Sequence, residues 1–269
     1  MDVKKVLYIS QEIDPYLPSS PLADFGHKLP QAILEKGVEV RTFMPKYGSI
    51  NERRNQLHEV IRLSGLNIDI NDVDYPLIIK VATLQPSRMQ VYFIDNDEFF
   101  FTRPGNNILE TVSNPEVNDE RSIFFVRGTL ETVKKLRWIP DVIQCTGWIS
   151  ALVPLYLKKM FAEDPTFMSA KSVYAIFDDQ FEGKLDPAMV EKLIHQGFDA
   201  DDLKKLSEAN DGIDYVALSK LAIDYADAVC QASENVNPEV LEYAKASGKP
   251  FLPYPGEDSA AYADFYKSL

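Results

Sequence analysis

The sequence predicts an α/β protein in which a Rossmann-like, mostly parallel sheet with flanking helices carries an additional antiparallel β meander. Apolar runs rich in β-branched residues recur along the chain, and several precede stretches with the periodicity of an amphipathic helix. Such alternation is typical of parallel strands joined by crossover helices. The chain has 269 residues, 45% of them hydrophobic, which is enough to bury a full core. The expected strands cover residues 6–10, 38–43, 77–84, 91–94, 142–145, 172–176 and 228–232.

The clearest local signal is the start of the first helix. Ser20 is a favoured N-cap residue, and Pro21 fits the first helical position, where its missing N–H costs nothing. Gly37 fits the position just beyond the helix, and we expect Pro30 to kink it. The residues expected on its buried stripe are Leu22, Phe25, Gly26, Leu29 and Ile33.

The other segments complete the predicted organisation. Residues 51–84 contain an alternating stretch over residues 57–63 and a turn, which indicates the antiparallel meander. Residues 95–118 are polar and indicate a long loop. Further helices are expected at residues 123–136, 187–207 with a break at Gly197, 215–227 and 238–246. We predict one domain over residues 1–252 and a short C-terminal tail over residues 253–269.

Composition and charge exclude several classes of protein. A net charge of -13 repels a phosphate backbone, and no cluster of Lys and Arg interleaved with aromatic residues offsets it, so we expect no nucleic-acid partner. No run approaches the roughly 18 apolar residues that span a bilayer, and no signal-peptide segment is visible, so we expect a cytoplasmic protein without a membrane partner.

The cysteines and histidines indicate no disulfide or metal chemistry. We interpret Cys145 and Cys230 as reduced, buried, small hydrophobic residues rather than a disulfide, because nothing suggests an oxidising compartment. The three histidines have no Cys or His at ligand spacing, so no metal framework and no cofactor are expected.

The first predicted βα turn carries the most informative motif. It contains Glu12 and Pro15, its helix contains Leu22 and Asp24, and the next strand runs into Pro45-Lys46-Tyr47. The pattern resembles the opening of bacterial glycogen synthases and plant starch synthases, which reads Ser-Glu-x-x-Pro, then Lys-x-Gly-Gly-Leu-x-Asp, and later Pro-x-Tyr. Here the positions of Lys-x-Gly-Gly hold Pro18, Ser19, Ser20 and Pro21.

These substitutions bear on phosphate binding. The resemblance implies that glycines let backbone N–H groups approach the nucleotide diphosphate while the lysine adds charge. Pro21 has no N–H to donate, and Pro18 has no charge. We therefore expect a retained scaffold with lost phosphate-binding chemistry. A structural role for the turn and a surviving ligand contact both stay open.

A second matching segment spans residues 140–154. In the synthases it resembles Pro-Asp-(Val/Ile)-(Val/Ile)-His-x-His-Asp-Trp-His-Thr, whose histidines and aspartate line the glucose site. Only Trp148 remains of that polar set, and it either stacks on a sugar or belongs to the core. None of the replacing residues can act as a charged or proton-transferring imidazole. They are Gln144, Thr146, Gly147 and Ile149.

Two further segments match the same family. Residues 172–183 are similar to a strand ending in Thr-Ile-His-Asn, with Phe177 and Asp178 at the last two positions. Asp178 and Asp179 suggest a metal site or an acid/base pair, but adjacent residues of an extended chain point opposite ways, so we interpret them as a solvated strand end. Asn118 and Arg121 match Asp-Asn-x-x-Arg-Phe, and helix capping by Asn118 is an adequate explanation.

The resemblance implies the N-terminal, acceptor-side half of a GT-B glycosyltransferase. Such enzymes transfer glucose from ADP-glucose to the non-reducing end of an α-1,4-glucan, and a second Rossmann-like domain supplies most donor contacts. This chain ends near the point where that domain would begin, so we expect little activity of this chain alone. No residue is assigned a catalytic role. A persisting site, for α-glucan and possibly ADP-glucose, is expected to be lined by Glu12, Asp14, Ser19, Ser20, Asp24, Tyr47, Arg121 and Trp148.

Three alternatives stay open. The chain is a non-catalytic glucan-binding or regulatory protein, or it is one subunit of a split synthase whose donor domain is a separate protein. The third alternative is an unrelated Rossmann-like binder, which the absence of a Gly-x-Gly-x-x-Gly turn disfavours for dinucleotides.

Overall fold

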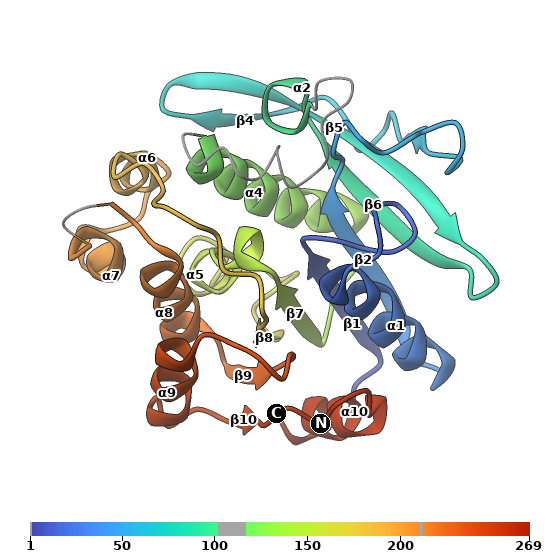
Figure 1. Cartoon of the computed structure of the whole chain (residues 1–269). Coiled ribbons are helices and arrows are strands. Elements are labelled where there is room, and N and C mark those ends of the chain that lie inside the picture. Colours follow the sequence, from blue (N-terminus) through green and yellow to red (C-terminus); the bar gives the residue numbers. More distant parts are fainter. Residues whose placement is uncertain (1, 102–116, 210–211) are drawn as a thin grey trace.

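A mostly parallel sheet forms the centre of the molecule, as the sequence predicts (Figure 1). The computed structural model describes residues 2–101, 117–209 and 212–269. The strands in these parts are β1 (Lys5–Ser10), β2 (Glu39–Pro45), β3 (His58–Glu59), β4 (Leu66–Ile70), β5 (Val73–Leu84), β6 (Met89–Asp95), β7 (Val142–Thr146), β8 (Lys171–Ile176), β9 (Ala228–Gln231) and β10 (Phe251–Leu252).

The strand order is β10-β9-β8-β7-β1-β2-β6-β5-β3, and β4 pairs with β5 beside this row. Neighbouring strands from β10 to β6 run parallel, whereas β5 is antiparallel to β6, β3 and β4. The predicted meander is therefore confirmed. Within the alternating stretch at residues 57–63, only the two residues of β3 form a strand, and a turn follows at residues 61–63.

The helices cover both faces of the sheet. Right-handed crossovers place the helix after β1 on the face opposite to the helices that follow β6, β7, β8 and β9. The described helical segments are α1 (Pro21–Glu35), α2 (Asp97–Phe100), α4 (Asn118–Leu136), η2 (Trp148–Ser150), α5 (Val153–Lys158), α6 (Met189–His195), η3 (Ala200–Leu203), α7 (Lys204–Ser207), α8 (Tyr215–Tyr225), α9 (Pro238–Ala246) and α10 (Ser259–Ser268).

The first helix begins and ends as the sequence predicts. The Ser20 hydroxyl accepts a hydrogen bond of 3.0 Å from the backbone N–H of Ala23, and Pro21 occupies the first turn. Gly37 follows the helix with a φ of 85°, a left-handed conformation that glycine adopts without strain. The stripe from Leu22 to Ile33 is buried, with Phe25 partly exposed.

The last helix was not anticipated. Residues 253–269, expected to form a short tail, contain α10, which packs against α1. Tyr262 and Tyr266 of α10 are buried, and Tyr266 donates a hydrogen bond to the side-chain oxygen of Gln144. The hydroxyls of Tyr266 and Tyr8 are 3.3 Å apart, so α10 covers the middle of the sheet.

Other predictions have mixed outcomes. Both cysteines are free and buried, as expected. The predicted helix over residues 187–207 does break at Gly197, between α6 and η3. Residues 96–101 of the predicted long loop contain α2, while residues 102–116 of that loop lie outside the described parts of the chain. No helix in the described ranges is both long and apolar enough to cross a membrane.

Candidate functional site

A cleft of about 760 Å³ lies at the carboxyl ends of the central strands. The chain passes from β1 to β2 on one side and later adds β7 on the other, so strand order reverses beside β1. Open α/β sheets bind ligands at such a reversal. The cleft is lined by residues that follow β1, β7, β8 and β9: Gln11, Glu12, Pro18, Ser19, Ser20, Pro21, Leu22, Trp148, Phe177, Asp178, Asp179, Gln180, Phe181, Glu182, Ser233 and Asn235.

The turn after β1 is held tightly against α1. Ser20, besides capping the helix, donates a hydrogen bond of 2.7 Å to Glu12 Oε2. A Cβ atom at Gly26 would lie 2.2 Å from the carbonyl oxygen of Glu12, so only glycine lets the helix approach the turn this closely. Glu12 is thereby fixed at the cleft, and it is 8% exposed.

The turn after β7 approaches the first turn just as closely. Gly147 has a φ of 90°, and a Cβ there would lie 2.5 Å from Gln11 Cβ. Trp148 follows and is 2% exposed, with its ring centroid 5.2 Å from that of Phe181. The indole is therefore a core side chain at the wall of the cleft, as one of the two predicted alternatives has it, and the sugar contact stays a prediction.

Asp179 joins the turns after β7 and β8. Its carboxylate accepts a hydrogen bond of 2.5 Å from the backbone N–H of Trp148 and one of 3.0 Å from the Tyr215 hydroxyl. Burial raises the pKa of Asp179 to about 7, and the charge of Glu12 adds to the rise. At neutral pH the Asp179 carboxyl therefore populates both protonation states, so it can accept a hydrogen bond or donate one.

The interpretation of the two aspartates as a solvated strand end is correct for Asp178, which is exposed, and wrong for Asp179. Asp179 turns inward, where its carboxylate accepts hydrogen bonds from a backbone N–H and from a hydroxyl. The signal was present in the sequence, since adjacent side chains on an extended segment point to opposite sides and one of the pair had to face the protein.

The structure brings together some of the eight residues predicted to line a site. Glu12, Ser19, Ser20 and Trp148 line the cleft. Asp24 lines a neighbouring groove to which Ser19 and Ser20 also contribute. The other three, Asp14, Tyr47 and Arg121, line neither hollow.

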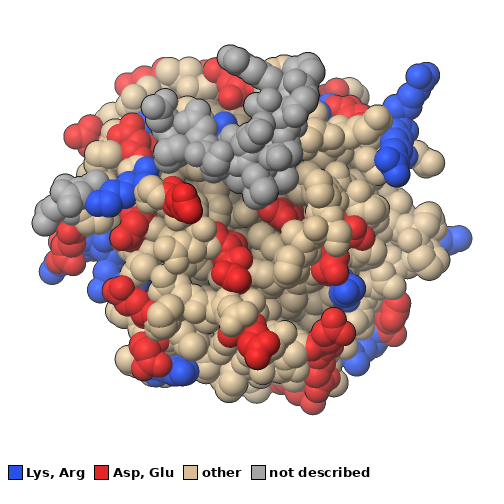
Figure 2. All heavy atoms as spheres, in the orientation of Figure 1, with Lys and Arg blue, Asp and Glu red and all other residues tan. Residues whose placement is uncertain are grey.

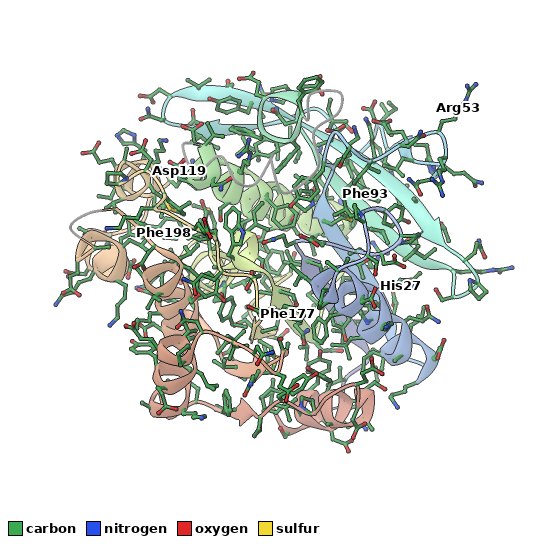
Figure 3. The ribbon with its side chains drawn as sticks, in the orientation of Figure 1. His27, Arg53, Phe93, Asp119, Phe177 and Phe198 are labelled. Atoms are coloured by element: carbon green, nitrogen blue, oxygen red, sulfur yellow. The ribbon has the colours of Figure 1, made fainter. Side chains whose placement is uncertain are left out.

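Asp14 and Arg121 interact with other residues of the protein, and Tyr47 is buried in it. The Asp14 carboxylate lies 3.4 Å from Nδ1 of His27, which Figure 3 shows on α1. Tyr47 is fully buried, and its hydroxyl has no hydrogen-bond partner within the described residues. Arg121 donates to the Phe99 carbonyl at 2.6 Å and to Asn118 Oδ1 at 2.8 Å.

The capping role expected for Asn118 is wrong. The N-cap position of α4 is Val117, which has no side chain able to cap, and Asn118 is the first helical residue. Its side-chain oxygen is instead the acceptor for Arg121, one turn along the helix. The Asn118 and Arg121 pair therefore fixes the start of α4.

Charge around the cleft is acidic. Among the described residues that line it are Glu12, Asp178, Asp179 and Glu182, and no Lys or Arg is among them. Burial raises the pKa of Glu12 as well. On the face shown in Figure 2, acidic side chains also lie over the central region, whereas Lys and Arg lie mostly toward the edges. No group of three or more potential metal ligands occurs in the described parts of the chain.

Comparisons with known proteins agree on one family. A family model described as the starch synthase catalytic domain matches residues 5–249. Glycogen synthase from Pelodictyon phaeoclathratiforme is 40% identical over 190 residues, which are 71% of this chain and 39% of that protein. Glycogen synthase from Chlorobaculum parvum is 34% identical over 243 residues, 90% of this chain and 48% of that protein. The chain thus spans less than half the length of these relatives.

A solved structure shows the same fold. The catalytic domain of Starch Synthase IV from Arabidopsis thaliana, bound to ADP and acarbose, superimposes with a TM-score of 0.74 at 19% identity. The alignment covers 94% of this chain and 51% of that one. The described domain therefore corresponds in fold to about half of that catalytic domain.

Proposed function

Because this chain belongs to the starch synthase catalytic domain family, we propose that its cleft binds the non-reducing end of an α-1,4-glucan. The domain would be the acceptor-side, N-terminal half of a GT-B glucosyltransferase that uses ADP-glucose. In this proposal the donor half is supplied by another domain or another chain, and the location is cytoplasmic, as expected from the sequence.

The acidic lining of the cleft is the observation that carries the proposal. Glucose hydroxyls are neutral donors and acceptors, and the carboxylates of Glu12 and Asp179 suit them as charge-assisted hydrogen-bond acceptors. The partly exposed ring of Phe181, which packs against the buried indole of Trp148, suits the apolar face of a sugar ring. A nucleotide diphosphate would instead meet like charges, and none of the described residues that line the cleft is a Lys or Arg.

Loss of the phosphate-binding motif supports weak donor binding. The helix start that would receive the diphosphate presents Pro21, which has no N–H, and Pro18 replaces the motif lysine. One missing charge-assisted hydrogen bond to phosphate costs about 1.5 to 3 kcal/mol, or roughly ten- to hundredfold in affinity. We therefore expect glucan binding without glucosyl transfer by this chain alone, which also fits a regulatory glucan-binding role.

Two measurements on the purified chain test the proposal. In affinity electrophoresis, glycogen in the gel should retard the protein relative to bovine serum albumin. In calorimetry, ADP and ADP-glucose should give no binding heat at micromolar concentrations. Unchanged mobility in glycogen would contradict the proposed glucan site.

A transfer assay separates binding from catalysis. Labelled glucose from ADP-glucose should not enter glycogen in the presence of this chain alone. Incorporation above the rate without protein would show that the chain needs no separate donor half, and it would overturn that part of the proposal.

A further inference from the structure

A second hollow adjoins the cleft, and part of its wall lies outside the segment that the family model matches. We call it the α1–α10 groove. It has a volume of about 570 Å³ and lies between α1 and the residues from Tyr254 to Tyr262. The match to the family model ends at residue 249, before this wall begins. Both volumes are within the usual range of ligand pockets, about 300 to 1,000 Å³.

The groove and the cleft are contiguous. Both are lined by Ser19, Ser20 and Pro21 at the start of α1, and by Phe177 and Ser233 at the strand ends. Phe177, labelled in Figure 3, therefore lies where the two hollows meet. A chain-like ligand that enters one hollow can continue into the other.

The floor of the groove is aromatic. The partly exposed ring of Phe25 lies with its centroid 5.5 Å from that of Phe177 and 5.7 Å from that of Tyr262, so it packs on two rings that are themselves 4% and 1% exposed. Tyr254 stands in the wall, and 40% of its surface is exposed. Exposed rings beside hydroxyl groups suit a ligand with both an apolar face and a polar rim.

The polar lining suits a neutral ligand. Lys28 is a cation on the groove, and its Nζ lies 3.0 Å from Asp24 Oδ2, so its charge is compensated locally. Glu257, Ser233 and Ser259 add a carboxylate and two hydroxyls. This combination offers hydrogen bonds to sugar hydroxyls, while it offers a phosphate no uncompensated positive charge.

We propose that the α1–α10 groove is an additional α-glucan subsite, which holds glucose units further along a chain whose end lies in the cleft. The proposal rests on the glucan binding proposed above and adds a length preference to it. A short oligosaccharide is held by the cleft alone, whereas a longer one also stacks on Tyr254.

The test is calorimetric titration of the whole chain with maltotriose and maltoheptaose. The wild-type protein should bind maltoheptaose more tightly. Tyr254→Ala should weaken maltoheptaose binding by about tenfold, the equivalent of one aromatic stacking contact, and leave maltotriose binding unchanged. The matched control is Ile61→Ala, which removes a 75% exposed side chain in the meander and should change neither affinity.

The outcomes separate this proposal from the proposed function. Wild-type protein that binds neither sugar would overturn both. Two results would overturn only the proposal that the groove binds glucan. One is equal affinity of the wild-type protein for the two sugars, and the other is the same loss of affinity for both sugars in Tyr254→Ala. A Tyr254-dependent affinity for ADP in place of maltoheptaose would assign the groove to a nucleotide and overturn the proposal as well.

A second variant guards against a folding defect in the first. Glu257 is exposed, so Glu257→Gln should fold normally, as near-ultraviolet circular dichroism would verify. It should weaken maltoheptaose binding by about threefold, since a neutral amide is the weaker acceptor. Unchanged maltoheptaose affinity in both variants would overturn the proposal that the groove is a glucan subsite.

Discussion

Two groups of acidic side chains lie at the same edge of the sheet and differ in what surrounds them. Beyond β2 and β6, the carboxylate of Glu52 lies 2.8 Å from Nζ of Lys46 and 2.7 Å from Nζ of Lys80. The same Lys80 Nζ lies 2.8 Å from Asp95 Oδ2. In the cleft, the donors to Glu12 and Asp179 among the contacts described are neutral, and they include the hydroxyls of Ser20 and Tyr215 and the backbone N–H of Trp148.

The difference appears in the pKa of Glu52. Burial acts to raise this pKa, but hydrogen bonds from Lys46 and Lys80 outweigh burial, and the pKa is lowered. At Asp95, the more buried carboxyl of the same cluster, burial outweighs the Lys80 hydrogen bond and raises the pKa. At Asp179, which has no cation beside it among the contacts described, burial raises the pKa to about 7. The first group is a closed ion-pair cluster that fixes the sheet edge. The second leaves carboxylates whose hydrogen-bonding capacity a ligand can use.

Removing the central cation of the ion-pair cluster should have the largest effect. Lys80→Met leaves Asp95, which is 5% exposed, without its partner, and loss of one member of a buried pair costs about 3 kcal/mol or more. Urea denaturation would measure the free energy of unfolding. Lys28→Met breaks the exposed pair with Asp24 and should leave the free energy of unfolding almost unchanged. Equal losses in the two variants would contradict the distinction between the closed cluster and an ordinary surface pair.

The cleft is shaped by backbone geometry, so Gly147→Ala should rank second. The new Cβ would meet Gln11 and would also adopt a positive φ, which together cost about 2 to 3 kcal/mol. Gly183→Ala is the matched control, because Gly183 has a φ of 81° but open space around it. Gly183→Ala should lower the free energy of unfolding by about 1 kcal/mol. If both variants lose the same amount by urea denaturation, the close approach of the two turns has no energetic consequence.

The effect of Asp179→Asn should depend on pH. The folded-state pKa of about 7 exceeds the ordinary value of 3.8, so the folded protein binds this proton more tightly than the unfolded chain. The stability contributed by Asp179 is therefore complete below the unfolded-state pKa and is lost as the pH rises through 7. Asparagine keeps one acceptor oxygen and carries no charge. The variant should therefore be more stable than wild type at pH 8 and lose this advantage as the pH falls toward 5.

Melting temperatures measured from pH 5 to pH 9 would test this expectation, and the gap between variant and wild type should narrow toward pH 5. Asp178→Asn, which changes the exposed neighbour, is the matched control variant. A constant gap for Asp179→Asn would mean that Asp179 is not an uncompensated carboxylate.

Local sequence signals were sufficient for most of the sheet and for the first helix. Buried parallel strands require continuous apolar runs, so β1, β7 and β8 were visible in the chain itself. Ser20 and Pro21 marked the helix start because capping depends on neighbouring residues only. These features are encoded within a few positions of where they act.

The site was less accessible to prediction because its chemistry is assembled from distant segments. Asp179 contacts Trp148 and Tyr215, which are 31 and 36 residues away in the chain, and no local pattern marks such partners. The resemblance directed attention to Tyr47 and Arg121, which lie outside the cleft, because their family positions were matched without their surroundings. The groove wall at Tyr254 was missed because the segment carries no motif of that family.

Docking of α10 has a consequence for how the polypeptide acquires its fold during synthesis. Tyr266 meets Tyr8 across 258 positions of the chain, and it also meets Gln144. A nascent chain can form β1 and α1 early, but the part of the sheet that lies under α10 remains uncovered until residue 266 has emerged from the ribosome. Final packing of this face must therefore follow translation of nearly the whole segment, and chaperones would have their longest access to it during that interval.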